Sequence, residues 1–215
     1  MRTLLDIDNP VIRFIIKIFD CMVLSVLWTV FSLPIITMGA SSTALYAAIY
    51  HHIRKEEGYL WSSFWKAFKE NFKRSTLSWL PLLAMMAFLI YDIVVLRAII
   101  QSGNPFGRLF GVVLVILLVA AVWAQFLAAY CARFQGGVKD MIRFSFYLMM
   151  AHPLRTLGVL AVIWGSIALI LVVPGLAALL PAVACWISSI FIEQVFELHL
   201  RPEDAEKEND EEESK

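Results

Sequence analysis

Long apolar segments alternate with short polar ones along most of the chain, and this alternation predicts the fold. A helix needs about 20 predominantly apolar residues to cross the hydrocarbon core of a bilayer. Segments that approach or reach this length lie near residues 20–36, 39–53, 76–96, 109–131, 156–173 and 176–196. The pattern therefore predicts an all-α protein, a polytopic transmembrane helical bundle of about six spans that forms one domain over residues 1–200.

The second of these segments, residues 39–53, is short for a span at 15 residues. Ala40, Ala44 and Ala48 fall on one face of it, and such small residues let helix backbones approach closely within a membrane. Two interpretations stay open. Residues 20–53 cross the membrane twice, the second time as a short buried helix, or they form a re-entrant hairpin that returns to the side from which it entered.

Residues 61–74, WSSFWKAFKENFKR, differ from the spans because they carry cations among aromatic residues. The aromatic residues recur at i, i+3, i+4, i+7 and i+11, so they share one helix face, and the cations lie largely on the others. This predicts a cytosolic interfacial amphipathic helix, with rings among acyl chains or against other helices and cations toward anionic headgroups. A second, partly amphipathic stretch lies at 140–150. The residues expected to contact membrane or partner are Trp61, Phe64, Trp65, Lys66, Phe68, Lys69, Phe72, Lys73 and Arg74.

The distribution of Lys and Arg predicts which side each polar region faces. With six spans, the N-terminal residues, 54–75 and 132–155 share one side and carry three, six and four of these cations. Only Arg97 and Arg108 face the other side. Because cytosolic loops carry the excess of Lys and Arg, we expect both termini in the cytosol. A single crossing by residues 20–53 would instead place the N-terminus outside.

Composition agrees with a membrane protein. The chain is 60% hydrophobic and 17% charged, which is more apolar surface than one soluble core can bury. The net charge of zero hides an asymmetry, because residues 1–200 carry 15 Lys and Arg against 10 Asp and Glu, whereas residues 201–215 carry 3 against 8. We expect this acidic tail to be disordered.

One alanine pattern occurs twice. Ala40, Ala44 and Ala48 are followed by Tyr50, and the same spacing returns 80 residues later, ending at Tyr130. The recurrence indicates either an internal duplication or a chance match, since alanine is common. Both sets are predicted to be helix-packing faces, with members Ala40, Ala44, Ala48, Ala120, Ala124 and Ala128.

Asp92, Gln125 and Glu193 are candidate functional residues because polar groups inside a membrane are costly. Asp92 lies near the outer end of its span with Arg97 within reach, so snorkelling toward the interface explains it. Glu193 lies near the inner end of the last span, which favours a capping or subunit-contact role over a proton relay. Gln125 is near mid-span, where we expect its amide to hydrogen-bond across helices, first as a packing contact and second as a substrate contact.

Enzyme signatures are absent from the sequence. It contains no GxxxxGK[ST] phosphate loop, no HExxH and no GxSxG. The three cysteines lie in apolar stretches without CxxC or Cys/His metal-binding spacing. We therefore expect no enzymatic activity, no cofactor or metal, and no nucleic-acid partner.

Several short motifs carry a family resemblance. They are Asn9-Pro10, Arg13-Phe14, Pro34-Ile-Ile-Thr-Met-Gly-Ala-Ser41, Thr43-Ala-Leu-Tyr46, Glu57-Gly-Tyr59 and the spacing Phe64, Phe68, Asn71-Phe72. With them the chain resembles the YesL family, small membrane proteins of Gram-positive bacteria classified as a domain of unknown function. The resemblance covers residues 8–200 and is strongest before residue 80. It implies a multi-pass protein of the bacterial cell membrane and brings no catalytic residues to transfer.

Members of that family are often encoded beside carbohydrate ABC importers, so the resemblance implies an accessory role in sugar uptake. Our first hypothesis is a non-enzymatic accessory or regulatory subunit of such an importer. Its partners would be anionic lipid of the inner leaflet and importer permease subunits, with a homo-oligomer left open. The alternative is a small transporter or channel with its own polar path between helices. Candidate lining residues for that path are Ser25, Thr29, Ser32, Gln125 and Ser166.

Overall fold

The structure, a computed structural model, describes residues 10–55, 59–101 and 109–198. Its helices are α1 (Pro10–Ser32), α2 (Met38–Ala48), α3 (Leu60–Gln101), α4 (Leu109–Arg133), α5 (Val138–Ala151), α6 (Pro153–Val172) and α7 (Leu180–Glu197). Short helical turns are η1 (Ile35–Thr37), η2 (Ile49–Arg54) and η4 (Pro174–Ala178). The predicted all-α fold is confirmed over these ranges, which contain no strand. The predicted acidic tail at 201–215 lies outside the described residues, as do Arg2, Asn9, Glu57 and Arg108.

Five of the described helices, α1, α3, α4, α6 and α7, are long and apolar enough to cross a membrane. They overlap five of the six predicted spans and indicate an integral membrane protein. The remaining predicted span, 39–53, corresponds to α2 with 11 residues and η2 with six. Nearly all of α2 is buried, as expected of a short helix enclosed by other helices. The number of crossings stays a prediction.

The predicted interfacial helix at 61–74 and the predicted span at 76–96 form one continuous helix, α3, of 42 residues. Residues 74–77 contain neither Gly nor Pro, so nothing in the sequence ends the helix there. At 1.5 Å per residue α3 is about 63 Å long, roughly twice the thickness of the hydrocarbon core. One crossing therefore uses about half of α3 and leaves residues 60–74, hereafter the α3 limb, outside that crossing. Pro81 lies inside α3, where it removes a backbone hydrogen bond and allows the helix to bend.

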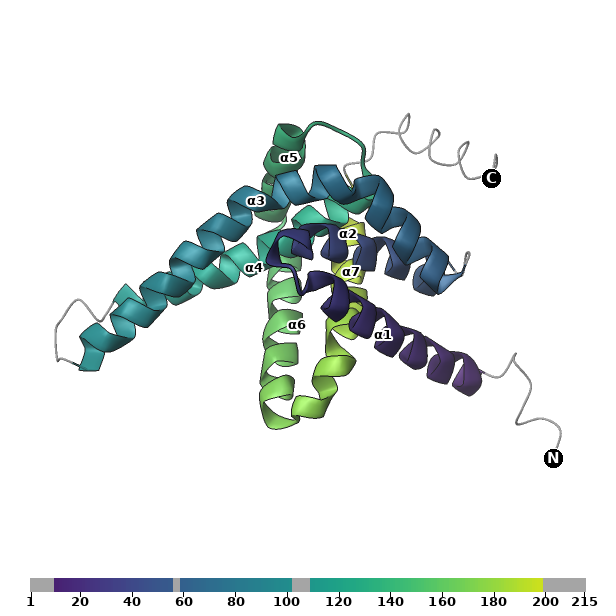
Figure 1. Cartoon of the computed structure of the whole chain (residues 1–215), viewed down its shortest axis with the longest axis horizontal. Coiled ribbons are helices and arrows are strands. Elements are labelled where there is room, and N and C mark those ends of the chain that lie inside the picture. The colour runs from purple at the N-terminus through teal and green to yellow at the C-terminus, as the bar shows by residue number, and fades with distance from the viewer. Residues whose placement is uncertain (1–9, 56–58, 102–108, 199–215) are drawn as a thin grey trace.

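The helices diverge from a common centre (Figure 1). In Figure 1 α3 curves over α2, its second half pairs with α4, and α6 and α7 form a hairpin that points downward. At the centre, α2 packs against α1, α3, α4 and α7. This placement explains why α2 is short and small-sided: it fills the junction between the other helices.

Close approach between α2 and α3 depends on Gly39. A Cβ atom on Gly39 would lie 2.4 Å from Cγ of Trp79, a distance that side chains do not tolerate. The alanines of the two predicted packing faces are all buried. Small side chains therefore set the distance between α2 and its neighbours.

Candidate functional site

The aromatic face of the α3 limb packs against α1. The ring of Phe31 lies 5.8 Å from that of Phe64, 5.5 Å from that of Trp65 and 5.1 Å from that of Phe68, measured between centroids. Phe64 is only 1% exposed, whereas Trp61 is 55% exposed. The sequence allowed these rings to lie either among acyl chains or against other helices. The inner rings of the face lie against another helix. Trp61 and Phe72 remain exposed at its edges.

The three lysines of the same limb face outward, whereas Arg74 is partly buried. Lys66, Lys69 and Lys73 are exposed, and the ammonium group of Lys69 lies 4.8 Å from the centre of the Trp65 ring. The guanidinium of Arg74 donates a hydrogen bond to the side-chain oxygen of Asn71. Because the aromatic side is held by α1, the three lysines have a fixed direction. Such a row of ammonium groups can bind phosphate or carboxylate groups outside the chain.

A buried ion pair joins three helices at the centre of the molecule. Nη1 of Arg133, at the end of α4, donates to Oε2 of Glu193 on α7 at 2.5 Å. The hydroxyl of Tyr46 on α2 donates to Oε1 of the same carboxylate at 2.6 Å. Tyr46 is fully buried and Glu193 is 3% exposed. Each carboxylate oxygen thus has a partner, which offsets the cost of removing the charges from water.

Aromatic and backbone contacts surround this ion pair. The guanidinium carbon of Arg133 lies 4.0 Å from the centre of the Tyr50 ring, a cation–π contact. Arg54, at the end of η2, donates to the backbone oxygen of Ser189 on α7 at 3.0 Å. These contacts tie both α2 and η2 to α7. The arrangement holds helices together, and its charges are engaged with one another.

Sequence reasoning identified Glu193 but missed Arg133 and Tyr46 as its partners. The sequence suggested a capping or subunit-contact role for Glu193, whereas its carboxylate contacts two other helices of its own chain. One signal was available. Glu193 and Arg133 both lie near the same predicted side of their spans, and a carboxylate in an apolar helix needs a cation at its own depth.

Asp92 does not pair with Arg97. Its side chain is partly exposed, and no ion pair joins it to the described part of the chain. The guanidinium of Arg97 lies instead over the ring of Phe110, 5.9 Å from its centre. This partial exposure is compatible with the interfacial position expected of Asp92.

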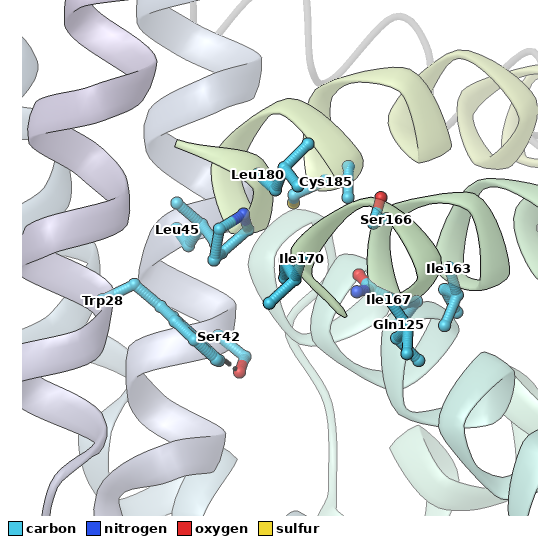
Figure 2. Close-up of a pocket in the computed structure, with 12 residues that line it drawn as sticks. Trp28, Ser42, Leu45, Gln125, Ile163, Ser166, Ile167, Ile170, Leu180 and Cys185 are labelled. Carbon is cyan, nitrogen blue, oxygen red and sulfur yellow. Dashed lines mark hydrogen bonds between the residues drawn. The ribbon is translucent and has the colours of Figure 1, made fainter. Parts of the chain in front are cut away.

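A cavity of about 200 Å³ lies among α1, α2, α4, α6 and α7 (Figure 2). Figure 2 shows Trp28 and Ser42 on one side of it and residues of α6 on the other. Gln125 of α4 lines the cavity and makes no hydrogen bond with the described residues. The full lining is Trp28, Ser42, Leu45, Gln125, Ile163, Ser166, Ile167, Ile170, Leu180, Pro181, Ala184 and Cys185.

Most of the hydroxyls predicted to line a polar path are bonded elsewhere. Ser25 accepts a hydrogen bond from the backbone of Ala182, and Thr29 donates to the backbone oxygen of Ser25. Ser32 pairs with Ser41. Of the five predicted lining residues, Gln125 and Ser166 line the cavity, and the Ser166 hydroxyl donates to its own helix at Val162.

Residues 21–93 match the model of a family described as "Protein of unknown function, DUF624". The match runs from α1 into the second half of α3 and so contains Tyr46, Gly39 and the α3 limb. It is consistent with the YesL-type resemblance over that part of the chain. Arg133, Glu193 and Gln125 lie beyond it.

No curated protein and no solved structure matches the chain. Within the described residues, no three His, Cys, Asp or Glu side chains gather as a metal site requires. The candidate sites are therefore defined by their own geometry: the outward lysines of the α3 limb, the buried ion pair, and the cavity beside Gln125.

Proposed function

We propose that the chain is a non-enzymatic accessory or regulatory subunit of a bacterial cell-membrane assembly, and that its partner is a carbohydrate ABC importer, as the YesL resemblance implies. The observation that carries the proposal is the two-sided α3 limb. Its inner rings pack on Phe31, and Lys66, Lys69 and Lys73 point outward. The limb is thus a rigid, cationic surface suited to anionic lipid or to an acidic patch on a partner.

The same proposal places both termini and the α3 limb on the cytosolic side. Its support is the asymmetry of Lys and Arg in the sequence. The described part of the limb carries Lys66, Lys69, Lys73 and Arg74 in a stretch of nine residues, which is the density expected of an inner-leaflet surface.

The composition of the cavity favours a role as the partner of a permease. It is less suited to the transport of sugar by this chain itself. A sugar in a low-dielectric site needs a partner for each of its hydroxyls, because an unpaired polar group there is costly. The Ser42 hydroxyl is engaged by the indole N–H of Trp28, and the Ser166 hydroxyl by Val162. Only Gln125 and the O–H of Ser42 would then be left to meet the several hydroxyls of a sugar.

The proposal is tested by mild-detergent purification of the tagged full-length chain from its native membrane. We expect permease subunits of a carbohydrate importer to be recovered with it, and the Lys66→Glu/Lys69→Glu/Lys73→Glu variant to recover less. A tagged variant carrying Glu70→Gln, an exposed acid on the same limb, serves as the control. Recovery of no importer subunit with the unaltered chain would contradict the proposed partner.

Anionic-lipid binding by the limb is a separate prediction. Each of Lys66→Gln, Lys69→Gln and Lys73→Gln is expected to weaken the preference for anionic lipid by about 1 kcal/mol, roughly fivefold, because each near-surface cation contributes that much. The measurement is the ratio of phosphatidylglycerol to phosphatidylcholine bound to the protein in mixed nanodiscs. Glu70→Gln should leave the ratio unchanged or raise it. Equal ratios for all four variants and the unaltered protein would refute the assignment.

A small transporter or channel is the second candidate, and the cavity beside Gln125 is the observation that favours it. This function would require a continuous polar path, to which Gln125 and Ser166 contribute. Solute uptake into reconstituted liposomes that Gln125→Leu abolishes would favour this candidate over the accessory role.

A further inference from the structure

The side chain of Gln125 is a partly exposed polar group among apolar neighbours. It lies near the middle of α4 and makes no hydrogen bond with the described residues. Within hydrocarbon, where water is scarce, an amide without a partner is strongly disfavoured. The amide borders the cavity, so a molecule in the cavity can supply the missing partner.

The cavity walls define which molecules fit. The polar members of the lining are Gln125, Ser42 and Ser166, together with the thiol of Cys185. The other lining side chains are aliphatic or aromatic, and none of them is charged. The Ser166 hydroxyl donates to its own helix, and the Ser42 hydroxyl accepts from the indole N–H of Trp28. The site therefore offers one amide, which can both donate and accept, and the O–H of Ser42, within a largely apolar, half-open cavity. A charged ligand would lose its hydration without gaining a counter-ion.

Size and access point to a small ligand that arrives from the membrane. An apolar cavity of about 150 Å³ is large enough to hold benzene, so about 200 Å³ accepts a ring or short chain with one substituent. At the rim, Ile167 is 43% exposed on α6, a helix with a largely exposed apolar surface. Molecules dissolved in the bilayer would reach the cavity by that route.

We propose that this cavity binds a small uncharged amphiphile, a ring or short alkyl chain with one hydroxyl or carbonyl group that hydrogen-bonds to the amide of Gln125. The site is separate from the cationic limb on which the proposed function rests. Loss of ligand binding would therefore leave importer association unaffected, and the two proposals can fail independently.

The test uses the full-length protein in detergent micelles with two probes, 4-fluorobenzyl alcohol and 4-fluorotoluene, followed by fluorine NMR. We expect saturable binding of both. In Gln125→Leu, the alcohol should bind about tenfold more weakly while the affinity for fluorotoluene is kept, because only the alcohol loses a hydrogen bond. Comparing each probe between the two proteins removes the effect of its partition into the micelle.

Two further variants locate the site. Ala184→Leu places a larger side chain in the lining and should abolish binding of both probes. Gln194→Leu, at an exposed position on α7 outside the lining, should change neither. Displacement of the alcohol by monoacylglycerol would identify membrane lipid as the source of the natural ligand. Displacement by hexanol but not by monoacylglycerol would identify a free alcohol as the source.

Two results would overturn the proposal. One is the absence of saturable binding to the unaltered protein. The other is equal affinity for the alcohol in the unaltered protein and in Gln125→Leu, which would show that the amide takes no part. If Ala184→Leu does not fold, the Gln125→Leu comparison still decides.

Discussion

Replacing Glu193 with leucine is expected to lower the free energy of unfolding by about 4 kcal/mol, because it removes the carboxylate that pairs with a buried cation. The side chain of Arg133 is 7% exposed and donates directly to Glu193. In the variant its guanidinium would remain enclosed beside Tyr50 and would lose its contact with the Glu193 carboxylate. The measurement is unfolding of the purified protein in detergent by titration with a denaturing surfactant.

Three further variants distinguish the contribution of the ion pair to stability from the contributions of neighbouring groups. The double variant Glu193→Leu/Arg133→Leu should recover part of the loss, because it removes the buried cation together with its carboxylate, while the Tyr46 hydroxyl still lacks its acceptor. Tyr46→Phe removes one hydrogen bond to a charged group and should cost about 2 kcal/mol. Glu197→Leu changes an exposed acid on the same helix and should have little effect. A double variant as unstable as the single one would contradict this account.

The ion pair also explains how the centre of the molecule is held together. Hydrophobic burial gives little preference among helices in lipid, because a neighbouring helix is no more apolar than the acyl chains. Packing and polar contacts must then select the partners of each helix. Here the contacts of Glu193 with Arg133 and Tyr46 determine that α7, α4 and α2 meet at one point.

The sequence was sufficient to predict helices and the two-sided character of the α3 limb. Apolar runs of about 20 residues identified five helices that the structure contains, because hydropathy over such a length reflects the thickness of the bilayer. The 3.6-residue recurrence of Phe64 and Phe68 predicted a shared face, and both rings contact Phe31.

Features that depend on contacts between distant segments were not predictable in the same way. We predicted a separate helix at residues 61–74 because they are more polar than residues 76–96. A change in polarity does not end a helix, and the two segments form one helix. Local patterns also contain no information on pairing across 60 or 147 residues, the separations of Arg133 and Tyr46 from Glu193. The structure of residues 39–53, a short buried helix, depends on the helices that enclose α2, and a local pattern does not specify those neighbours.

Gly39→Ala is expected to destabilise the protein by roughly 3 kcal/mol, the upper end of what overpacking a core costs. The added Cβ would lie 2.4 Å from Cγ and 2.5 Å from Cβ of Trp79, so α2 and α3 would have to separate. Trp79 is 5% exposed and cannot move aside into solvent or lipid without leaving its contacts. Surfactant-induced unfolding of the purified variant measures the loss.

Gly165→Ala on α6 is the matched control, because it makes the same chemical change in a helix where no atom lies within 4 Å of the new Cβ. There alanine should stabilise the helix by about 1 kcal/mol, since glycine is a poor helix former. The same substitution, glycine to alanine, should thus lower the free energy of unfolding at position 39 and raise it at position 165. In a double-mutant cycle, Trp79→Gly, which removes both the Cβ and the Cγ that the new methyl group would meet, should remove most of the cost of Gly39→Ala. A neutral or stabilising Gly39→Ala would mean that α2 and α3 are not in close contact, and the central position of α2 would then be wrong.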